Sequence, residues 1–558
     1  MKDRELTLKD KDGIPVNTAA KKGEKVFKDI LSVLSVIYCV IIFAGLPLLY
    51  HNGYYDIGEF KYSFFFYATV SYICISVFIL ILFLLAKVFF FGFDPLSVIG
   101  IIKSVTVTDR IAVTYLFICI ISFILCRYNT WAFFGENVTN PPLKGYYGWH
   151  MGLISQCLFV IIYFLVSRTL KGNFRKILLF SLLAGSLAVF ILGVFHRFLV
   201  DPLGLYKGID PAYRIYFLST LGQATWFSSF LCTVMPVAMA LFIFDTRNRY
   251  RIAYAVYISI ASMALVTQNS DSAFIALFVV LATLLMFSLD ANNHLIMYLQ
   301  LVVLILLSFR FIGILQLIFK SSAVKLGNMP VFFSQSVFML LFTLLVIALY
   351  LGISYYLSEH DLHISRHPSI RYVVILLILI PVAICLMIVI LATGGYINAP
   401  GGIFSEEYVV LNDHWGNGRG FTWRITIEMF RDFSLQEKLF GIGPDCYADY
   451  AYEYRYALIK EKWGTEVLAN AHNEWLNSIF TTGIAGFVSY IGIFISSAVC
   501  FIKKRKANIL CIGITASIFA YISHNSFCYQ QVLCTPMLFV LTAFSYAVIF
   551  DSEKKTDN

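Results

Sequence analysis

Apolar runs of about 20 residues alternate with short polar connections along nearly the whole chain. A helix needs about that length to cross the hydrocarbon core of a bilayer, and in lipid it satisfies its own backbone hydrogen bonds. Fourteen runs have cores at 30–49, 62–86, 110–127, 151–167, 177–195, 221–244, 252–267, 273–289, 295–319, 331–357, 372–393, 475–502, 508–527 and 531–550. The pattern predicts an all-α polytopic membrane protein with about 12–14 transmembrane helices in a lipid bilayer.

The polar connections divide the chain into five parts. We expect a cytoplasmic N-terminal tail at 1–29, a first transmembrane region of about eleven spans at 30–393, a large extracytoplasmic loop at 394–474, a second transmembrane region of about three spans at 475–550, and a cytoplasmic tail at 551–558. The first part is rich in lysine and lacks the apolar core and cleavage site of a signal peptide. Within the loop, Gly and Pro punctuate short helical pieces, one of them expected at Trp423–Phe433.

Charge gives the orientation. The chain is 59% hydrophobic and 13% charged, about half the charged share that is usual for a soluble protein. With the N-terminus inside, the loops that fall inside contain the basic runs Arg168–Lys176, Arg247–Arg251, Lys503–Lys506 and Lys554–Lys555. This distribution follows the positive-inside rule. The net charge of +9 therefore reflects topology, and we expect no nucleic-acid partner.

The cysteines and the residues of metal-ligating type indicate no disulfide and no metal site. Of the twelve cysteines only Cys446 lies clearly in the outer loop, no CxxC is present, and we assign no disulfide. The inner loop Glu359–His367 holds acids and histidines, but their spacing matches no zinc pattern, so we expect no metal. The sequence has no Walker loop, GxGxxG, GxSxG or HExxH, and we expect no cofactor.

The first candidate for chemistry is His472, where the large loop meets the twelfth span. One interpretation is a capping segment, with Asn473 as N-cap and Trp475 as an interfacial anchor. The other is a general base: a helix N-terminus lowers the pKa of an imidazole, and a neutral imidazole can take a proton from a hydroxyl. The same helix end favours a phosphate. Gly483 and Gly486 would allow a helix or a lipid chain to approach closely.

Arginines on the exported loops form the second group. Arg419 is flanked by glycines and is either a flexible loop charge or an anion clamp, and Arg424 follows it on the same loop. Guanidinium groups bind phosphate oxygens with two hydrogen bonds, which lysine does less well. Arg214, on the preceding exported loop, is either a snorkelling interfacial residue or a third anion ligand, with Gln223 close behind it.

Two further residues complete the set. Lys144 and His150 lie on an earlier exported loop and form a weaker group. The candidate substrate-binding residues are Arg424, Asn473, Lys144, His150 and Gln223.

These residues carry a resemblance to the O-antigen ligase and polymerase superfamily (the Wzy-C family). The segment His472-Asn473, followed nine residues later by Gly483-Ile484-Ala485-Gly486, is similar to its signature. The run from Gly418-Arg419 through Trp423 to Gly441-Ile442-Gly443-Pro444-Asp445 resembles the periplasmic loop of the family, and Arg214-x-x-x-Leu218 its arginine motif. The sequence departs from the family after Arg214, where Gly222-Gln223-Ala224-Thr225 replaces a Gly-Asn-Pro-Asn-like run, which puts the local donor contacts in question.

The resemblance implies a glycosyltransferase in surface-polysaccharide biosynthesis. It would sit in the cytoplasmic membrane of a bacterium and act on the extracytoplasmic side. The donor would be a glycan linked to undecaprenyl pyrophosphate, and the acceptor a hydroxyl of a glycan, lipid or protein. By this resemblance His472 is the base, Arg419 and Arg214 stabilise the pyrophosphate leaving group, and neither metal nor nucleotide is required. A base beside the anomeric carbon favours a single inverting displacement.

Two other classes of protein stay open. A secondary transporter or lipid flippase of glycan precursors would place charges at mid-membrane, whereas this chain concentrates them in outer loops. A non-catalytic membrane scaffold would use the large loop for binding alone. Between ligase and polymerase the sequence does not decide.

Overall fold

The chain folds into a helical bundle, seen in a computed structural model that describes residues 18–91, 105–135, 148–360, 363–402, 404–506 and 508–556. The helices at the expected spans are α1 (Thr18–Val40), α3 (Ile57–Ala86), α5 (Val107–Leu125), α7 (Leu153–Thr169), α8 (Arg175–Arg197), α9 (Ala224–Phe244), α10 (Arg251–Thr267), α11 (Ser272–Ser288), α12 (Asn292–Ile318), α14 (Val337–Glu359), α15 (Ser369–Thr393), α20 (Glu474–Lys504), α21 (Ile509–Asn525) and α22 (Thr535–Thr556). Every apolar run of the sequence is therefore a helix, which confirms the predicted fold class.

Shorter elements connect these helices. They are η1 (Ile41–Gly45), α2 (Leu46–Leu48), η2 (Lys87–Phe91), α6 (Asn129–Phe134), η4 (Gly172–Phe174), η5 (Pro211–Tyr216), η6 (Asn248–Tyr250), η7 (Lys320–Ser322), α13 (Asn328–Gln335), η8 (Ile364–Arg366), α16 (Glu406–Val409), α17 (Trp415–Asp432), α18 (Leu435–Phe440) and α19 (Tyr447–Trp463). Strands β1 (Phe217–Leu218) and β2 (Gly222–Gln223) pair antiparallel. This hairpin lies in a loop that the apolar pattern left without structure.

Length separates the helices into two groups. Within the described ranges, eleven helices are long and apolar enough to cross a membrane, and α7, α11 and α21 are shorter. Each of these three has 17 residues. That gives a length of about 25 Å, near the lower limit for a span.

Two connections between spans are informative. The turn between α10 and α11 is closed by Gln268, whose side chain donates to the carbonyl of Ser270 (2.8 Å) and accepts from its N–H (2.7 Å). The two spans predicted there are thus separate helices. The span predicted from residue 331 begins later, at Val337, because Ser336 has an extended backbone and caps α14. The preceding residues form the separate helix α13.

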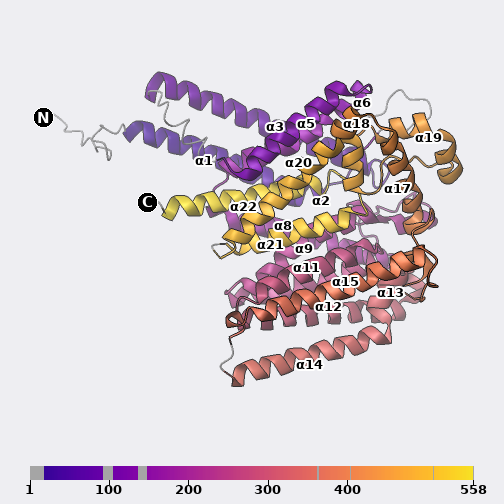
Figure 1. The fold of residues 1–558 in the computed structure, drawn as a ribbon. Coiled ribbons are helices and arrows are strands. Elements are labelled where there is room, and N and C mark those ends of the chain that lie inside the picture. Colours follow the sequence, from indigo (N-terminus) through magenta and orange to yellow (C-terminus); the bar gives the residue numbers. More distant parts are fainter. Residues whose placement is uncertain are drawn as a thin grey trace.

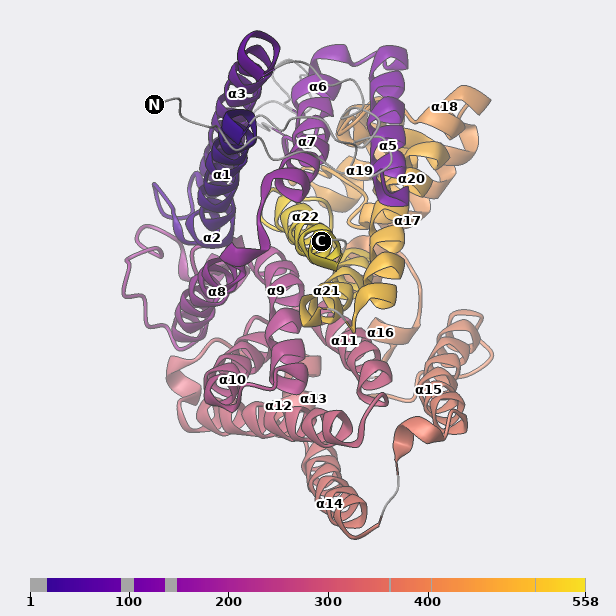
Figure 2. The same ribbon diagram turned by 90° about the vertical axis from the view of Figure 1, so that its left-hand side faces the viewer.

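Helix α9 lies at the centre of the bundle, where it packs against α21, α10 and α11 (Figure 2). Its apolar window is 100% buried, whereas that of α15 is 0% buried. Helices α14 and α15 lie at the edge of the bundle, away from α9 (Figures 1 and 2). A helix that is apolar on all sides must bury its surface in protein or in lipid, so α9 forms the core and α15 faces lipid.

Both termini lie at one end of the bundle, and the loop helices α17, α18 and α19 lie at the other (Figure 1). At the end with the termini, Lys171 pairs with Asp29, and Lys504 pairs with Glu553 at 2.7 Å. The basic loops expected inside therefore lie beside the terminal segments. The loop between α15 and α20 lies on the opposite side, as the predicted topology requires.

The large loop docks against α20 through glycines. Helix α17 confirms the expected helical piece; its bounds begin at Trp415, but Gly416, Asn417 and Gly418 have non-helical backbone, so the regular helix begins after Gly418. A Cβ atom on Gly483 would lie 2.2 Å from the Leu439 carbonyl oxygen, and one on Gly441 2.2 Å from the Thr481 carbonyl oxygen. Both glycines have φ +75°, which side chains disfavour. Gly483 thus serves the close approach that the sequence predicted, with α18 as the partner.

We predict that Gly483→Ala detaches α18 from α20. The added methyl group meets backbone and a strained φ, at a combined cost of about 2–5 kcal/mol. The measurement is the thermal unfolding midpoint in detergent. Gly352→Ala is the matched control, because a Cβ at that helical glycine meets nothing within 4 Å. Equal midpoints for the two variants would contradict the docking.

Candidate active site

The segment before α20 holds His472 in an unusual backbone conformation. Asn473 caps α20 by accepting hydrogen bonds from the N–H groups of Trp475 and Leu476, each at 3.1 Å. His472 has φ 48°, in the left-handed region, and its N–H donates to the Asn470 side chain at 2.8 Å. Such conformations cost about 1–3 kcal/mol in non-glycine residues and gather at functional sites. The capping interpretation holds for Asn473, while the strain at His472 needs a further reason.

The ring of His472 faces an aromatic cluster. Its centroid lies 5.4 Å from that of Tyr529, edge to face at 85°. The Tyr529 hydroxyl donates to Gln223 (2.8 Å) and accepts from the Trp226 indole N–H (2.9 Å). Gln223 ends the β1–β2 hairpin, Trp226 lies in the first turn of α9, and Tyr529 lies between α21 and α22. Three segments that are distant in the sequence therefore meet beside the imidazole.

Burial and a neighbouring charge keep the imidazole neutral. Burial and, to a smaller extent, the positive charge of Arg419 lower the pKa of His472 to about 4. The sequence predicted this direction from the helix N-terminus, but burial is the largest cause. The pKa of Arg419 is itself lowered by burial. Its guanidinium donates to the Gly416 carbonyl at 3.0 Å, and its Nε has no hydrogen-bond partner among the described residues.

Two other arginines of the large loop are neutralised by carboxylates. Arg424 forms hydrogen bonds with both oxygens of Asp413 (2.9 and 2.7 Å) and with Glu428 (2.9 Å). Arg455 pairs with Asp432 at 2.9 Å. Among the described residues, Arg419 has no such ion pair, so its charge is available to an anion. Arg424, proposed from the sequence as a substrate ligand, is already occupied.

Arg214 lies in η5, in the segment between α8 and β1. Its guanidinium stands over the Tyr206 ring, 5.7 Å from the centroid, and its Nε has no hydrogen-bond partner within the described ranges. No described contact joins Arg214 to His472. The β1–β2 hairpin that follows Arg214 reaches the site instead, through Gln223.

A buried carboxylate lies directly behind His472. Glu474 accepts hydrogen bonds from the hydroxyls of Tyr490 (2.6 Å) and Tyr521 (2.9 Å) and from the side-chain amide of Asn525. Only 3% of Glu474 is exposed. Because all the donors to Glu474 come from α20 and α21, these hydrogen bonds hold the two helices together beside the imidazole.

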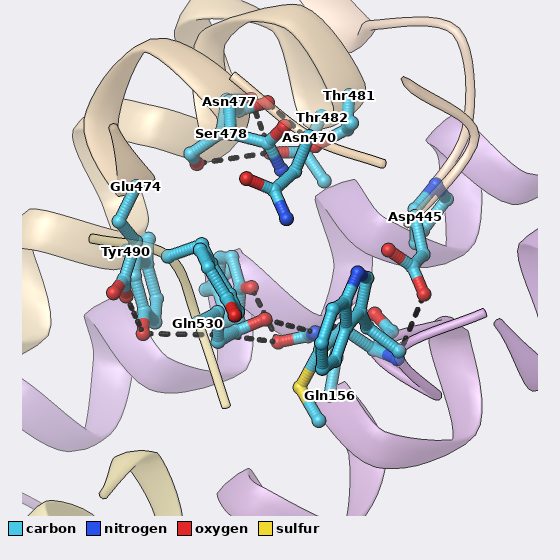
Figure 3. Close-up of a pocket in the computed structure, with 15 residues that line it drawn as sticks. Gln156, Asp445, Asn470, Glu474, Asn477, Ser478, Thr481, Thr482, Tyr490 and Gln530 are labelled. Carbon is cyan, nitrogen blue, oxygen red and sulfur yellow. Dashed lines mark hydrogen bonds between the residues drawn. The ribbon is translucent and has the colours of Figure 1, made fainter. Parts of the chain in front are cut away.

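Glu474 also borders a polar cavity of about 40 Å³, which is room for a few water molecules (Figure 3). Asp445 lies on its other side, and Gln156 and Gln530 are hydrogen-bonded to each other (2.8 Å) between them. Burial raises the pKa of Asp445 to about 7. A carboxyl group that titrates near neutral pH in a cavity marks a functional region. Tyr529 lies in the wall, so this cavity adjoins the His472 cluster.

A second pocket, of about 350 Å³, lies beyond Trp149, which lines both cavities. His150 lines it, with its ring stacked on Tyr62 (4.0 Å between centroids) and its Nε2 2.9 Å from Glu59. Trp226 also lines it. The pocket thus connects His150 to the aromatic cluster. Lys144, predicted with His150, lies outside the described residues.

The geometry can be set beside known families. Residues 326–491 match the family model described as O-antigen ligase. This segment is similar to the O-antigen ligase family. The match supports the resemblance seen in the sequence and includes Arg419 and His472, whereas the Arg214 motif lies outside it. A comparison with curated proteins found no match.

The match supports a glycosyltransferase- or ligase-type enzyme of surface-glycan biosynthesis. The candidate site extends beyond residues 326–491. The hydrogen-bonded group beside the His472 ring consists of Gln223, Trp226 and Tyr529, and all three lie outside that range.

Sequence reasoning missed three of these groups. Glu474 carried a signal, since an acidic residue in the first turn of an apolar span is rare in membranes and functional by default. Trp226 and Tyr529 carried none, because aromatic residues are common near the ends of spans. Only the folded chain brings them to one imidazole.

We predict that Arg419→Gln raises the pKa of His472, because a positive charge that disfavours the imidazolium is removed. Burial, the larger cause, remains, so the pKa stays below the ordinary 6.5. Histidine ¹⁵N chemical shifts followed over pH measure this. Arg431→Gln, on the exposed part of α17, is the control and leaves the titration unchanged. An unaltered His472 pKa in Arg419→Gln would show that the charge of Arg419 does not act on His472.

Proposed function

We propose that this protein transfers glycan from an undecaprenyl-pyrophosphate carrier to a hydroxyl of a glycan, lipid or protein. The observation that carries the proposal is the proximity of a neutral, strained imidazole, His472, to the guanidinium of Arg419, which forms no ion pair among the described residues. One group can accept a proton and the other can bind an anion, which are the two needs of this reaction.

The reaction forms two bonds, the new C–O bond and an N–H bond on His472, and breaks two, the acceptor O–H bond and the sugar–pyrophosphate C–O bond. The acceptor oxygen attacks the anomeric carbon as His472 takes its proton, and the sugar–pyrophosphate C–O bond breaks with its electron pair left on the phosphate. Attack opposite the leaving group inverts the anomeric centre. Arg419 stabilises the charge that develops on pyrophosphate, in surroundings where burial strengthens electrostatic interactions. Arginine supplies this charge, so the proposal requires no metal.

Donor binding would also activate the base. At pH 7 an imidazole with a pKa of about 4 is protonated in roughly one molecule in a thousand. A pyrophosphate beside Arg419 offsets the positive charge that lowers this pKa, and thereby raises it toward the working pH. His472 would thus become a stronger base only when the leaving group is in place.

Arg214 is proposed as a second pyrophosphate ligand. It has no carboxylate partner among the described residues, and the hairpin that follows it contacts Tyr529 through Gln223. The pyrophosphate would lie between Arg214 and Arg419, and each guanidinium would bind it from one side. Gln223 is proposed to orient Tyr529 and, through it, the imidazole.

We place the site at the outer face of a bacterial cytoplasmic membrane. The termini and the basic loops lie at one end of the bundle and the large loop at the other (Figure 1). The positive-inside rule puts the basic end in the cytoplasm. The acceptor would then be available in the extracytoplasmic space.

The decisive experiment incubates purified protein with an undecaprenyl-pyrophosphate-linked glycan and candidate acceptors, with and without EDTA. Mass analysis identifies the acceptor that gains sugar. Single transfer indicates a ligase and a ladder of repeats a polymerase. Transport of the donor without a new glycosidic bond would contradict the proposal.

We expect His472→Ala to lower the transfer rate about 10²- to 10⁴-fold, the usual contribution of a general base. Arg419→Ala should lose transition-state stabilisation of a similar size, about 10²- to 10³-fold. Arg431→Ala is the matched loop arginine, exposed on α17, and keeps wild-type activity. Full transfer by a folded His472→Ala protein would exclude it as the base.

The pH dependence follows from the same pKa. The base works when neutral, so kcat/KM, which reports the free enzyme, should be lost only as the pH falls through about 4. The loss of kcat should occur at a higher pH than the loss of kcat/KM, because bound pyrophosphate raises the pKa of His472. Asp445, with a pKa of about 7, lines the adjoining cavity, so Asp445→Asn is measured in parallel to remove its titration. Coincident losses of kcat and kcat/KM would show that the donor does not act on His472.

A further inference from the structure

Two buried thiols face each other where the large loop meets α5. Cys126 follows the last residue of α5, and Cys446 precedes the first residue of α19. Their sulfur atoms are 3.8 Å apart, and the residues are 6% and 0% exposed. Among the described residues no other pair of cysteines shares such a contact. Sulfur atoms in this contact can approach to the bonded distance of about 2.05 Å with a small side-chain rotation.

The surrounding backbone holds the two thiols together. A Cβ atom on Gly443 would lie 2.3 Å from the Cys126 sulfur, so only glycine lets this turn approach so closely. The Tyr128 N–H donates to the same sulfur at 3.1 Å. The pKa of Cys126 lies below its ordinary value because Cys446 donates to it, with further contributions from Tyr128 and Arg127.

Ion pairs dock the two segments independently of the sulfurs. Arg127 pairs with Glu453 of α19 at 3.1 Å and donates to the Tyr454 hydroxyl at 2.8 Å. The two thiols therefore lie in a fixed interface, where their contact persists.

We propose that Cys126 and Cys446 form a disulfide that joins the large loop to α5. This departs from the sequence-based expectation of no disulfide, which saw Cys446 as the lone cysteine of the loop and counted Cys126 with the spans. The proposal rests on the outward orientation of the loop, where compartments favour disulfides, and not on glycosyl transfer.

The oxidation requires a partner that carries a disulfide, namely a thiol–disulfide oxidoreductase at the outer face. The Cys126 thiolate attacks one sulfur of that disulfide and forms a mixed disulfide. Cys446 then attacks the Cys126 sulfur and releases the partner. One S–S bond forms in this chain as two S–H protons are lost, and two electrons reduce the partner to its dithiol.

The disulfide would brace one wall of the site. Cys446 follows Asp445, whose carboxylate accepts from the Met151 N–H at 2.9 Å and lines the polar cavity. A covalent link at Cys446 thus fixes the position of Asp445 relative to α5 and α7.

The test is differential alkylation of the full chain, purified from membranes of an oxidising host without reductant. The denatured protein is treated with N-ethylmaleimide, then reduced and treated with its isotope-labelled form. We expect the second label on Cys126 and Cys446 alone among the twelve cysteines, and one disulfide-linked peptide pair before reduction. First label on both residues, or a link from either to another thiol, would overturn the proposal.

Two variants identify the pairing. In Cys126→Ser, Cys446 should take the first label, because its partner is gone. Cys74→Ser, at an exposed position of α3, is the matched control and leaves the second label on the pair. The wild-type labelling decides the question even if Cys126→Ser fails to fold. Because labelling requires no glycan, its outcome is separate from that of the transfer assay.

Discussion

The buried carboxylate of Glu474 is the interaction on which the arrangement of this site depends. A carboxyl group inside a membrane bundle is costly to bury unless hydrogen-bond partners satisfy it. The partners are Tyr490 on α20 and Tyr521 and Asn525 on α21, so these hydrogen bonds fix the relative position of the two helices. His472 lies two residues before Glu474, and Tyr529 four residues after Asn525. The geometry of the imidazole is thus set by a carboxylate that does not touch it.

Ion pairing explains which arginines remain for substrate. The loop carries several guanidinium groups, and Arg424 and Arg455 are each held by carboxylates at its exposed surface. Arg419 is partly buried, lies near the neutral histidine and has no carboxylate partner among the described residues. A cation kept partly out of water without an anion binds an incoming phosphate more strongly than one that must first release a carboxylate.

The sequence predicted what local pattern controls. Fourteen apolar runs became fourteen helices, because backbone satisfaction in lipid leaves a run of that length no other regular structure. The break at Ser336 was not predicted, because it depends on one capping hydroxyl within an apolar run. His472 and Arg419 could be found because their neighbours form a recognisable string. Gln223 and Tyr529 are 306 residues apart, and only tertiary contact reveals that they bond to each other.

The differing burial of α15 and α20 has a mechanical consequence for the loop between them. The loop starts from α15, whose apolar window is entirely unburied, and ends at α20, where a hydrogen-bonded carboxyl group and glycine contacts hold the chain. The end of the loop at α15 is therefore positioned by lipid, and the end at α20 by protein. The thickness and lateral pressure of the surrounding bilayer act directly on the α15 end alone. The residues nearest the chemistry, at the α20 end, are insulated from those forces.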